Sequence, residues 1–156
     1  EEGYQQIASV FMATAEQELS HARMFFSRLE GGSVEITAAY PAGVVADTKT
    51  NLAEAAAGER EEWSMLYADF AGIAREEGFP DIANIFNLVA KVEVEHEKRY
   101  MRLLERLENG TEFQQEEATE WECRKCGYVH TGKSAPKRCP VCGMDQGWFE
   151  RKANNY

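Results

Sequence analysis

An internal repeat at an offset of 75 residues constrains the fold of this chain most strongly. The stretch "EEGYQQIASVF" at residues 1–11 returns as "EEGFPDIANIF" at residues 76–86, and the first 30 residues share 11 identities with their counterparts. A repeat of this kind indicates a duplicated supersecondary unit. The upstream partner of residues 51–75 falls before Glu1. The opening of the chain therefore corresponds to the middle of the duplication.

Apolar side chains recur at steps of three and four residues in three segments, 4–30, 51–75 and 80–108, and this periodicity predicts three long helices. Gly31-Gly32 and Asn109-Gly110 are typical helix terminators. Pro80 lies where a first turn tolerates proline. The chain is therefore expected to be mainly α-helical.

The first two predicted helices are joined by "GGSVEITAAYPAGVVADTKTN", which has no helical period. A connection of about 20 residues is long for a simple helical hairpin. It suggests a crossover along a bundle, as in ferritin-like four-helix folds. Three helices and one crossover predict such a bundle without its first helix.

Acidic and histidine side chains lie on the apolar stripes of the predicted helices. Three pairs stand three residues apart, so the members of each pair share a helix face: Glu18 and His21, Glu59 and Glu62, and Glu93 and His96. A buried, uncompensated carboxylate costs several kcal/mol, and no Lys or Arg lies on these stripes. Two multivalent cations would supply the charge, and this ligand set suits iron or manganese better than structural zinc.

Chance is the main alternative for any single Glu-x-x-His motif in so acidic a chain. Here the two copies align at the repeat offset, and both lie on core-facing stripes, which favours a metal site. Tyr67 lies near the face of Glu59 and is either a core aromatic residue or a hydrogen-bond donor to a ligand. Four acids off the stripes are expected to be solvated helix surface: Glu61, Glu95, Glu97 and Glu105.

All cysteines of the chain fall in "CRKCGYVHTGKSAPKRCPVCG", as two Cys-x-x-Cys pairs. Four thiolates at this spacing close a tetrahedron around one ion, so we expect a metal site at Cys123, Cys126, Cys139 and Cys142. A zinc ribbon and a mononuclear iron–thiolate centre share this geometry. His130 is expected on the surface, because the four sulfurs complete the sphere. Free thiols suit a reducing cytoplasm.

Composition excludes some functions and suggests two domains. The net charge of -10 argues against a nucleic-acid or anionic-membrane surface. No apolar run approaches the roughly 20 residues of a membrane span. The acid-rich residues 111–120 are expected to link a helical domain, 1–110, to a small cysteine domain, 121–156.

Taken together, the two sites resemble the rubrerythrin family, in which a ferritin-like di-iron bundle precedes a rubredoxin-like domain. Cys-Gly-Tyr after the first pair and Cys-Pro-x-Cys-Gly at the second are similar to rubredoxin. The resemblance favours iron over zinc at the four-cysteine site, with zinc as a possible substitute, and implies two irons in a carboxylate-bridged site.

The resemblance also implies roles for the helical residues. Glu18 and Glu93 would bridge the two irons, His96 would bind one of them, and Glu59 would be a terminal ligand.

Three further residues match the catalytic part of the family's site. Glu62 and His21 correspond to the pair between which one iron shifts when its oxidation state changes. Tyr67 corresponds to a tyrosine that hydrogen-bonds near the cluster.

The family has one further glutamate, on a first helix. The repeat places it independently, since the partner of Glu59 lies 17 residues before Glu1. We therefore expect a missing N-terminal helix, possibly supplied by another chain or fragment.

The resemblance implies a cytoplasmic peroxidase that reduces hydrogen peroxide to water. Electrons would come from a reductase or a rubredoxin through the iron of the four-cysteine site, in a head-to-tail homodimer. An alternative is a ferroxidase or iron-storage protein, although storage needs no electron inlet. A third possibility, a bundle with a purely structural zinc ribbon, predicts a colourless protein.

Overall fold

The computed structural model describes residues 2–155. It divides into two compact units, one formed by Thr14–Arg102 and the other by the residues up to Ala13 together with those from Leu103 onward. The first unit is helical and the second is built around a small sheet. Across the described residues, no helix is both long and apolar enough to cross a membrane.

Helix α1 spans Gln5–Phe26 and ends four residues before the predicted end at residue 30. The chain tightens after Phe26, where the amide of Leu29 donates to the carbonyl of Phe26 at 3.1 Å. The Ser27 hydroxyl also donates to the Met24 carbonyl at 2.7 Å. Leu29 is exposed, so no packing extends the helix further.

The second predicted helix is a continuous run with an irregular centre. It consists of α2, Thr48–Glu61, a π-helical turn, Glu62–Leu66, and α3, Tyr67–Glu76. Asp47 caps its start by accepting a hydrogen bond from the amide of Thr50 at 2.8 Å. The run therefore begins three residues earlier than the apolar pattern indicates.

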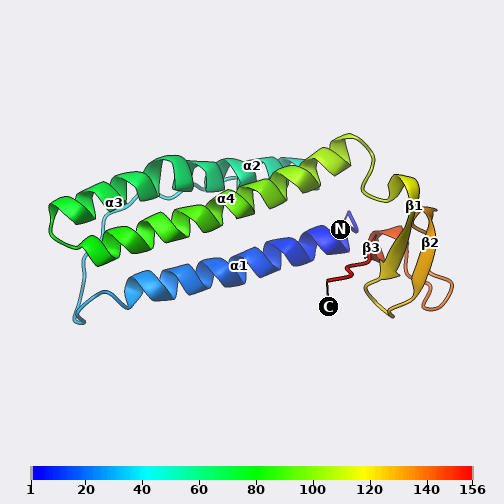
Figure 1. Ribbon diagram of the computed structural model, residues 1–156, viewed down its shortest axis with the longest axis horizontal. Helices are drawn as coiled ribbons and strands as arrows, with labels where there is room; N and C mark the ends of the chain where they lie inside the picture. The colour runs from blue at the N-terminus through cyan, green and yellow to red at the C-terminus, as the bar shows by residue number, and fades with distance from the viewer. Residues whose placement is uncertain (1, 156) are drawn as a thin grey trace. The chain divides into compact units, whose positions relative to one another are not determined.

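Helix α4 spans Pro80–Glu108, as the sequence predicts. Residues 31–47 contain neither helix nor strand, and this connection returns along the bundle, so that α1 and α2–α3 run in the same direction and α4 runs opposite to them (Figure 1). The expected crossover is confirmed.

One cluster in the core of the helical unit is built mainly from small and aromatic side chains. Ala71, Ala74 and Ala83 form a buried cluster against Ile82 and Phe86. Such small residues let α3 and α4 approach closely. The ring of Phe25 on α1 stacks on Phe86 with centroids 5.1 Å apart, which joins the third helix to this core.

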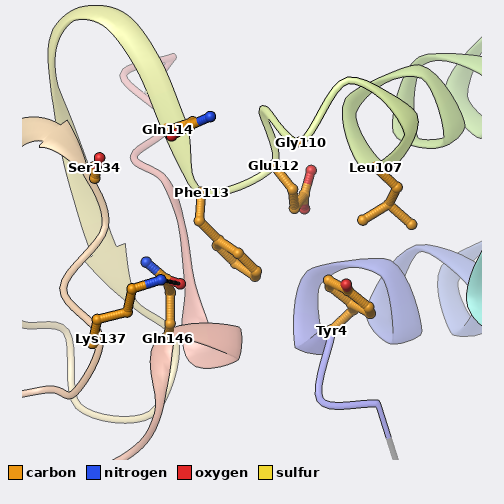
Figure 2. A pocket seen from close by; sticks show the side chains of 9 residues that line it. All are labelled: Tyr4, Leu107, Gly110, Glu112, Phe113, Gln114, Ser134, Lys137 and Gln146. Atoms are coloured by element: carbon orange, nitrogen blue, oxygen red, sulfur yellow. Dashed lines mark hydrogen bonds between the residues drawn. The ribbon is translucent and has the colours of Figure 1, made fainter.

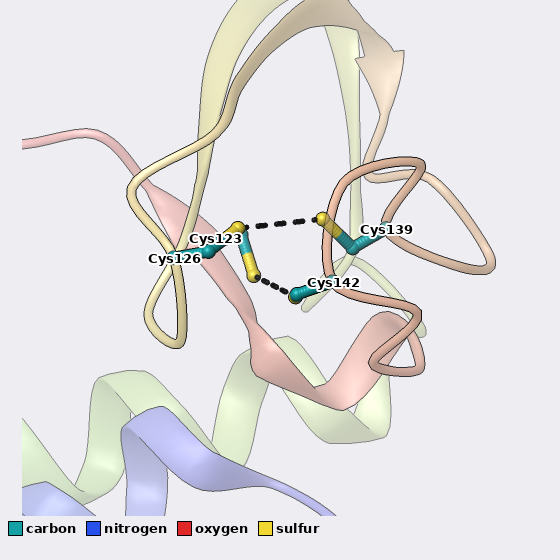
Figure 3. A group of neighbouring side chains, drawn as sticks. All are labelled: Cys123, Cys126, Cys139 and Cys142. Atoms are coloured by element: carbon teal, nitrogen blue, oxygen red, sulfur yellow. Dashed lines mark hydrogen bonds between the residues drawn. The ribbon is translucent and has the colours of Figure 1, made fainter.

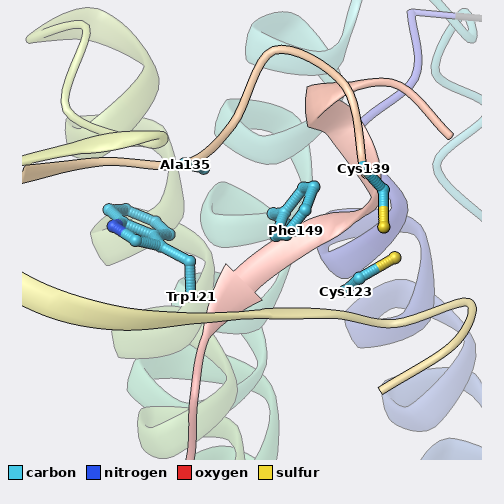
Figure 4. Packing of buried hydrophobic residues seen from close by; sticks show 5 residues of the cluster. All are labelled: Trp121, Cys123, Ala135, Cys139 and Phe149. Atoms are coloured by element: carbon cyan, nitrogen blue, oxygen red, sulfur yellow. The ribbon is translucent and has the colours of Figure 1, made fainter. Parts of the chain in front are cut away.

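The small unit contains a three-stranded antiparallel sheet in the order β2-β1-β3. Its strands are β1, Gln114–Cys123, β2, Val129–Ser134, and β3, Phe149–Arg151, and the 3-10 turn Gln146–Trp148 precedes β3. Most of β1 lies in the segment 111–120 that the sequence suggests as a linker. The core residues Trp121, Cys123, Ala135, Cys139 and Phe149 pack beside the sheet (Figure 4).

Candidate functional site

The predicted carboxylate and histidine ligands come together inside the helical unit. Glu18 on α1, Glu59 on α2, and Glu93 and His96 on α4 place one ligand atom each within 4.8 Å of the others. Each pair of the sequence pattern faces the helix interface because its spacing is close to one turn. Three separate helices therefore build one site.

Glu18 and Glu93 each lie between the two histidines of the site. One oxygen of Glu18 lies 3.1 Å from Nδ1 of His21, and its other oxygen lies 3.0 Å from Nδ1 of His96. The oxygens of Glu93 divide in the same way, at 3.1 Å from His21 and 2.9 Å from His96. The two imidazoles mark two adjacent positions, and each carboxylate offers one oxygen to each.

The polar atoms of this site fit a metal rather than a hydrogen-bond network. Glu18 Oε1, Glu59 Oε2, both oxygens of Glu93 and His96 Nδ1 are buried without a hydrogen-bond partner. The carboxylate oxygens lie within ion-pair distance of His96 or His21. The lone pairs of these atoms point toward a common space and not toward hydrogen-bond donors. Unpaired buried charges are costly, and cations between them would remove that cost.

The pKa of His96 shows that the carboxylates of this site stabilise a positive charge beside them. The carboxylates of Glu18, Glu59 and Glu93, which lie 3.0, 3.4 and 2.9 Å from Nδ1, raise the pKa of His96 to about 11. Without a metal, the ring would therefore hold a proton that a metal can replace.

Glu62 and Tyr67 stand at the π-helical turn beside these ligands. Burial and the charges of Glu59, Glu93 and Glu18 raise the pKa of Glu62 to about 7. Burial and the charge of Glu62 raise the pKa of Tyr67, so its hydroxyl stays protonated and donates a hydrogen bond to Glu62. The Tyr67 ring also packs 5.9 Å from Phe86 between centroids. The ring of Tyr67 therefore belongs to the aromatic core, and its hydroxyl meets Glu62, whose role as a metal ligand stays a prediction.

A residue outside the predicted set orients His96. Gln17 Oε1 lies 2.9 Å from His96 Nε2. If Nε2 carries the proton, it donates to Gln17 and leaves Nδ1 to bind a metal, and histidines that bind metals commonly donate their other ring N–H in this way. Only its position, directly before Glu18, links Gln17 to the site in the sequence.

The sequence-based assignment of Glu97 to solvated surface is wrong. Glu97 is only 8% exposed and lies between α4 and α2. Its Oε1 accepts a hydrogen bond from Arg60 Nε at 2.7 Å, and its Oε2 accepts one from Trp63 Nε1 at 2.7 Å. Both partners lie on the run from α2 to α3. The π-helical turn changes the helical register of that run at this point.

The four cysteines form a second cluster in the small unit, with all sulfurs within 4.8 Å of one another (Figure 3). Sγ of Cys123 lies 3.7 Å from that of Cys142, and Sγ of Cys126 lies 3.6 Å from that of Cys139. These separations leave all four thiols free and suit four ligands around one ion. His130 pairs with Trp121 across β1 and β2, outside this cluster.

Backbone amides support thiolates at this site. The amides of Lys125 and Cys126 donate to the sulfur of Cys123, and those of Val141 and Cys142 donate to that of Cys139. Burial acts to raise the pKa of Cys139, but these amides and the neighbouring thiols lower it to about 7. The reverse holds for Cys126, since the amide of Tyr128 lowers its pKa while burial and the other sulfurs raise it to about 12. Only a cation lets all four sulfurs ionise together.

The small unit also has a cavity of about 410 Å³ that no predicted ligand lines (Figure 2). The rings of Tyr4 and Phe113 stack there with centroids 6.0 Å apart. Glu112, whose side chain is 6% exposed, has one buried oxygen without a hydrogen bond, 4.0 Å from Arg106. Burial raises the pKa of Glu112, and the charges of Arg106 and Arg151 offset this only in part.

Family models match both parts of the chain. The rubrerythrin model matches residues 1–104 and 50–125, and the model of the rubredoxin-like domain of rubrerythrin matches residues 121–150. The chain belongs to the rubrerythrin family. This membership, with the two clusters described above, gives it a di-iron site of carboxylates and histidines and a rubredoxin-like iron site of four cysteines.

Rubrerythrins from two bacteria show how much of the chain is shared. The rubrerythrin of Porphyromonas gingivalis is 57% identical over 155 residues, covering 99% of this chain and 78% of the relative. That of Nitratidesulfovibrio vulgaris is 46% identical over 155 residues, covering 99% and 81%.

Solved structures of nigerythrin share the fold. The partially reduced form matches with a TM-score of 0.59 and 29% identity over 96% of this chain and 72% of the other. The fully reduced, all-ferrous form gives a TM-score of 0.58 at the same identity and coverage. Rubrerythrins are iron-based oxidoreductases whose rubredoxin-like domain indicates electron-transfer partners.

Proposed function

We propose that this rubrerythrin is a peroxidase that reduces hydrogen peroxide to two waters and serves in oxidative-stress defence. The observation that carries the proposal is the presence of two different metal sites in one chain, one rich in carboxylates and one of four thiolates. Two electrons and two protons are needed for each peroxide. A storage protein has no need of the second site.

The family resemblance and the geometry of the first site support the following ligand roles. Glu18 and Glu93 would bridge two irons, with Glu59 and His96 as further ligands. His21 and Glu62 would offer alternative ligands to one iron. When bound, the two irons supply the electrons that cleave the O–O bond.

Glu62 and Tyr67 would handle protons. Because burial raises the pKa of Glu62, its carboxyl would hold a proton while it is not bound to iron and give that proton to a departing oxygen. The Tyr67 hydroxyl, which stays protonated, would hold the carboxyl of Glu62 in place.

The thiolate site would relay electrons. Four cysteines held by short turns and backbone amides change little when the ion at their centre gains or loses one electron, which favours rapid transfer. Cys123, Cys126, Cys139 and Cys142 would hold one iron, and an external reductase or rubredoxin would supply it with electrons. Because these thiols must stay free, we propose a reducing cytoplasm as the location.

Domain boundaries and assembly also belong to this proposal. The helical domain would comprise 1–110, the linker 111–120, and the rubredoxin-like domain 121–156. A head-to-tail homodimer, inferred from the family resemblance, would bring donor and acceptor sites together.

A further helix would complete the di-iron site. Glu18 is 38% exposed at its side chain while Glu93 is fully buried, so the site is open beside Glu18. A helix carrying one more glutamate, at the place that the repeat predicts, would cover this side. Full two-metal binding by residues 1–156 alone would contradict this.

The test of the peroxidase proposal is Cys126→Ser. Reductase-driven consumption of hydrogen peroxide should be abolished, while a di-iron site reduced chemically beforehand should still react once. The reference is wild-type protein that includes the further helix, with a metal count near three irons and a red colour. Reductase-driven turnover that survives the substitution would contradict the relay, and rapid oxidation and retention of added ferrous iron without peroxide turnover would favour iron storage.

A further inference from the structure

The π-helical turn Glu62–Leu66 is what brings Glu62 and Tyr67 together. The amide of Tyr67 donates to the carbonyl of Glu62, which is the wide i to i+5 bond of a π-helix. In a regular α-helix, residues five apart are separated by about 140° around the axis. The wide turn removes most of this separation, so the hydroxyl of Tyr67 reaches the carboxyl of Glu62.

Such a turn needs support from outside the helix, because its backbone bonds are less regular than those of an α-helix. Trp63 lies inside the turn, and Arg60 lies two residues before it. Both side chains bind Glu97 of α4: Trp63 through Nε1 at 2.7 Å, and Arg60 through Nε at 2.7 Å and Nη2 at 2.5 Å. The Ser64 hydroxyl adds a bond to the Arg60 carbonyl at 2.6 Å.

Glu97 is well suited to hold this turn and poorly suited to bind a metal. Both of its oxygens are occupied, and the carboxylate is nearly buried, so its charge-assisted bonds are strong. It follows His96 directly on α4, and Glu93 lies one turn earlier. A displacement of Glu97 would therefore also displace the ligands on α4 and the turn that carries Glu62.

We propose that Glu97 is a positioning residue that clamps the π-helical turn through Trp63 and Arg60, and so sets the place of the Glu62 carboxyl relative to Glu93 and His96. Through this clamp the two helical runs keep one register at the metal site. The inference rests on the proposed role of Glu62 as a ligand.

The test measures Co²⁺ binding to the full chain, because cobalt reports its ligands through its visible absorption. In Glu97→Gln, the carboxylate site should bind Co²⁺ at least about tenfold more weakly, as is typical when a residue that orients metal ligands is removed. Its ligand-field spectrum should also change. Trp63→Phe keeps the ion pair between Arg60 and Glu97. It should therefore weaken Co²⁺ binding and change the spectrum in the same direction as Glu97→Gln, but less. The thiolate absorption of Co²⁺ at the four cysteines should not change in either variant.

Two reference variants make the result decisive. Glu95→Gln is the matched control, since Glu95 lies on the same helix but pairs with Lys98 in solvent, and it should bind Co²⁺ like the wild type. Glu62→Gln should weaken binding through the ligand itself. If Glu62→Gln weakens binding and Glu97→Gln and Trp63→Phe do not, the clamp is refuted while the proposed function stands.

If Glu62→Gln also binds normally, the ligand role of Glu62 fails instead. A purely structural role of Glu97 would lower the melting temperature with affinity and spectrum unchanged, and this would overturn the inference. If Glu97→Gln does not fold by circular dichroism, Trp63→Phe decides alone.

Discussion

The two metal sites are built in opposite ways. The carboxylate site collects ligands from three helices, and its residues lie up to 78 positions apart, from Glu18 to His96. The cysteine site uses two short turns within 20 residues, from Cys123 to Cys142. The first site is held by helix packing that exists without a metal. The second has a core of five buried residues, two of which are themselves ligands.

Metal removal tests this difference most directly and should have the largest effect. A thiolate-bound ion contributes about 10–16 kcal/mol to the folding of small metal domains, more than so few buried side chains can supply. Chelation should therefore collapse the amide NMR signals of β1 and β3 to random-coil positions. The signals of α4 should remain dispersed, because Val89, Leu103 and their apolar neighbours stay packed.

Restoring Fe²⁺ or Zn²⁺ is the control and should recover the sheet signals. A sheet that stayed ordered without metal would contradict the difference between the two sites. The same holds if the signals of the sheet and of α4 collapsed together.

Substituting Gln17 should have a smaller effect, confined to the helical site. Gln17→Leu removes the acceptor at Nε2 of His96, so the ring loses its fixed orientation. Metal affinity at the carboxylate site should fall about tenfold, as measured by Co²⁺ titration. The cysteine site of the same molecule is the internal reference, and Glu16→Gln, at the exposed neighbouring position, is the matched control. An unchanged affinity in Gln17→Leu would show that helix packing alone orients His96.

Glu112 offers the smallest and most specific test, because it is a buried acid without a predicted metal. Its pKa is raised above the ordinary 4.5, so the folded protein binds more protons than the unfolded chain. The free energy of unfolding should therefore fall as the pH rises from 4.5 through the folded-state pKa. Glu112→Gln removes this loss and should be more stable than the wild type by about 1 kcal/mol at neutral pH.

The measurement is urea unfolding of both proteins at several pH values, with Glu116→Gln on the exposed part of β1 as control. The advantage of Glu112→Gln should grow with pH and be absent for the control. An advantage that did not depend on pH would mean that Glu112 stays in one protonation state, and the buried-acid interpretation would fail.

The candidate metal ligands could be predicted from the sequence at both sites, but for different reasons. The cysteine spacing is local, so the turns and their amides follow from adjacent residues. For the helical site, the repeat aligned Glu18 and His21 with Glu93 and His96, and helical periodicity placed all of them on the apolar stripes of their helices. The domain boundaries at 110 and 120 stay a prediction.

Only the tertiary structure decided how these residues meet. The division of the Glu18 and Glu93 oxygens between His21 and His96 depends on the positions of two helices. Glu97 was misassigned because periodicity compares each residue with its own helix, whereas its burial depends on Arg60 and Trp63 of another. The π-helical turn that joins Glu62 to Tyr67 has no local signal either, since no Gly or Pro lies within it. Sequence spacing fixes which face a side chain occupies, and contacts between helices fix what it touches there.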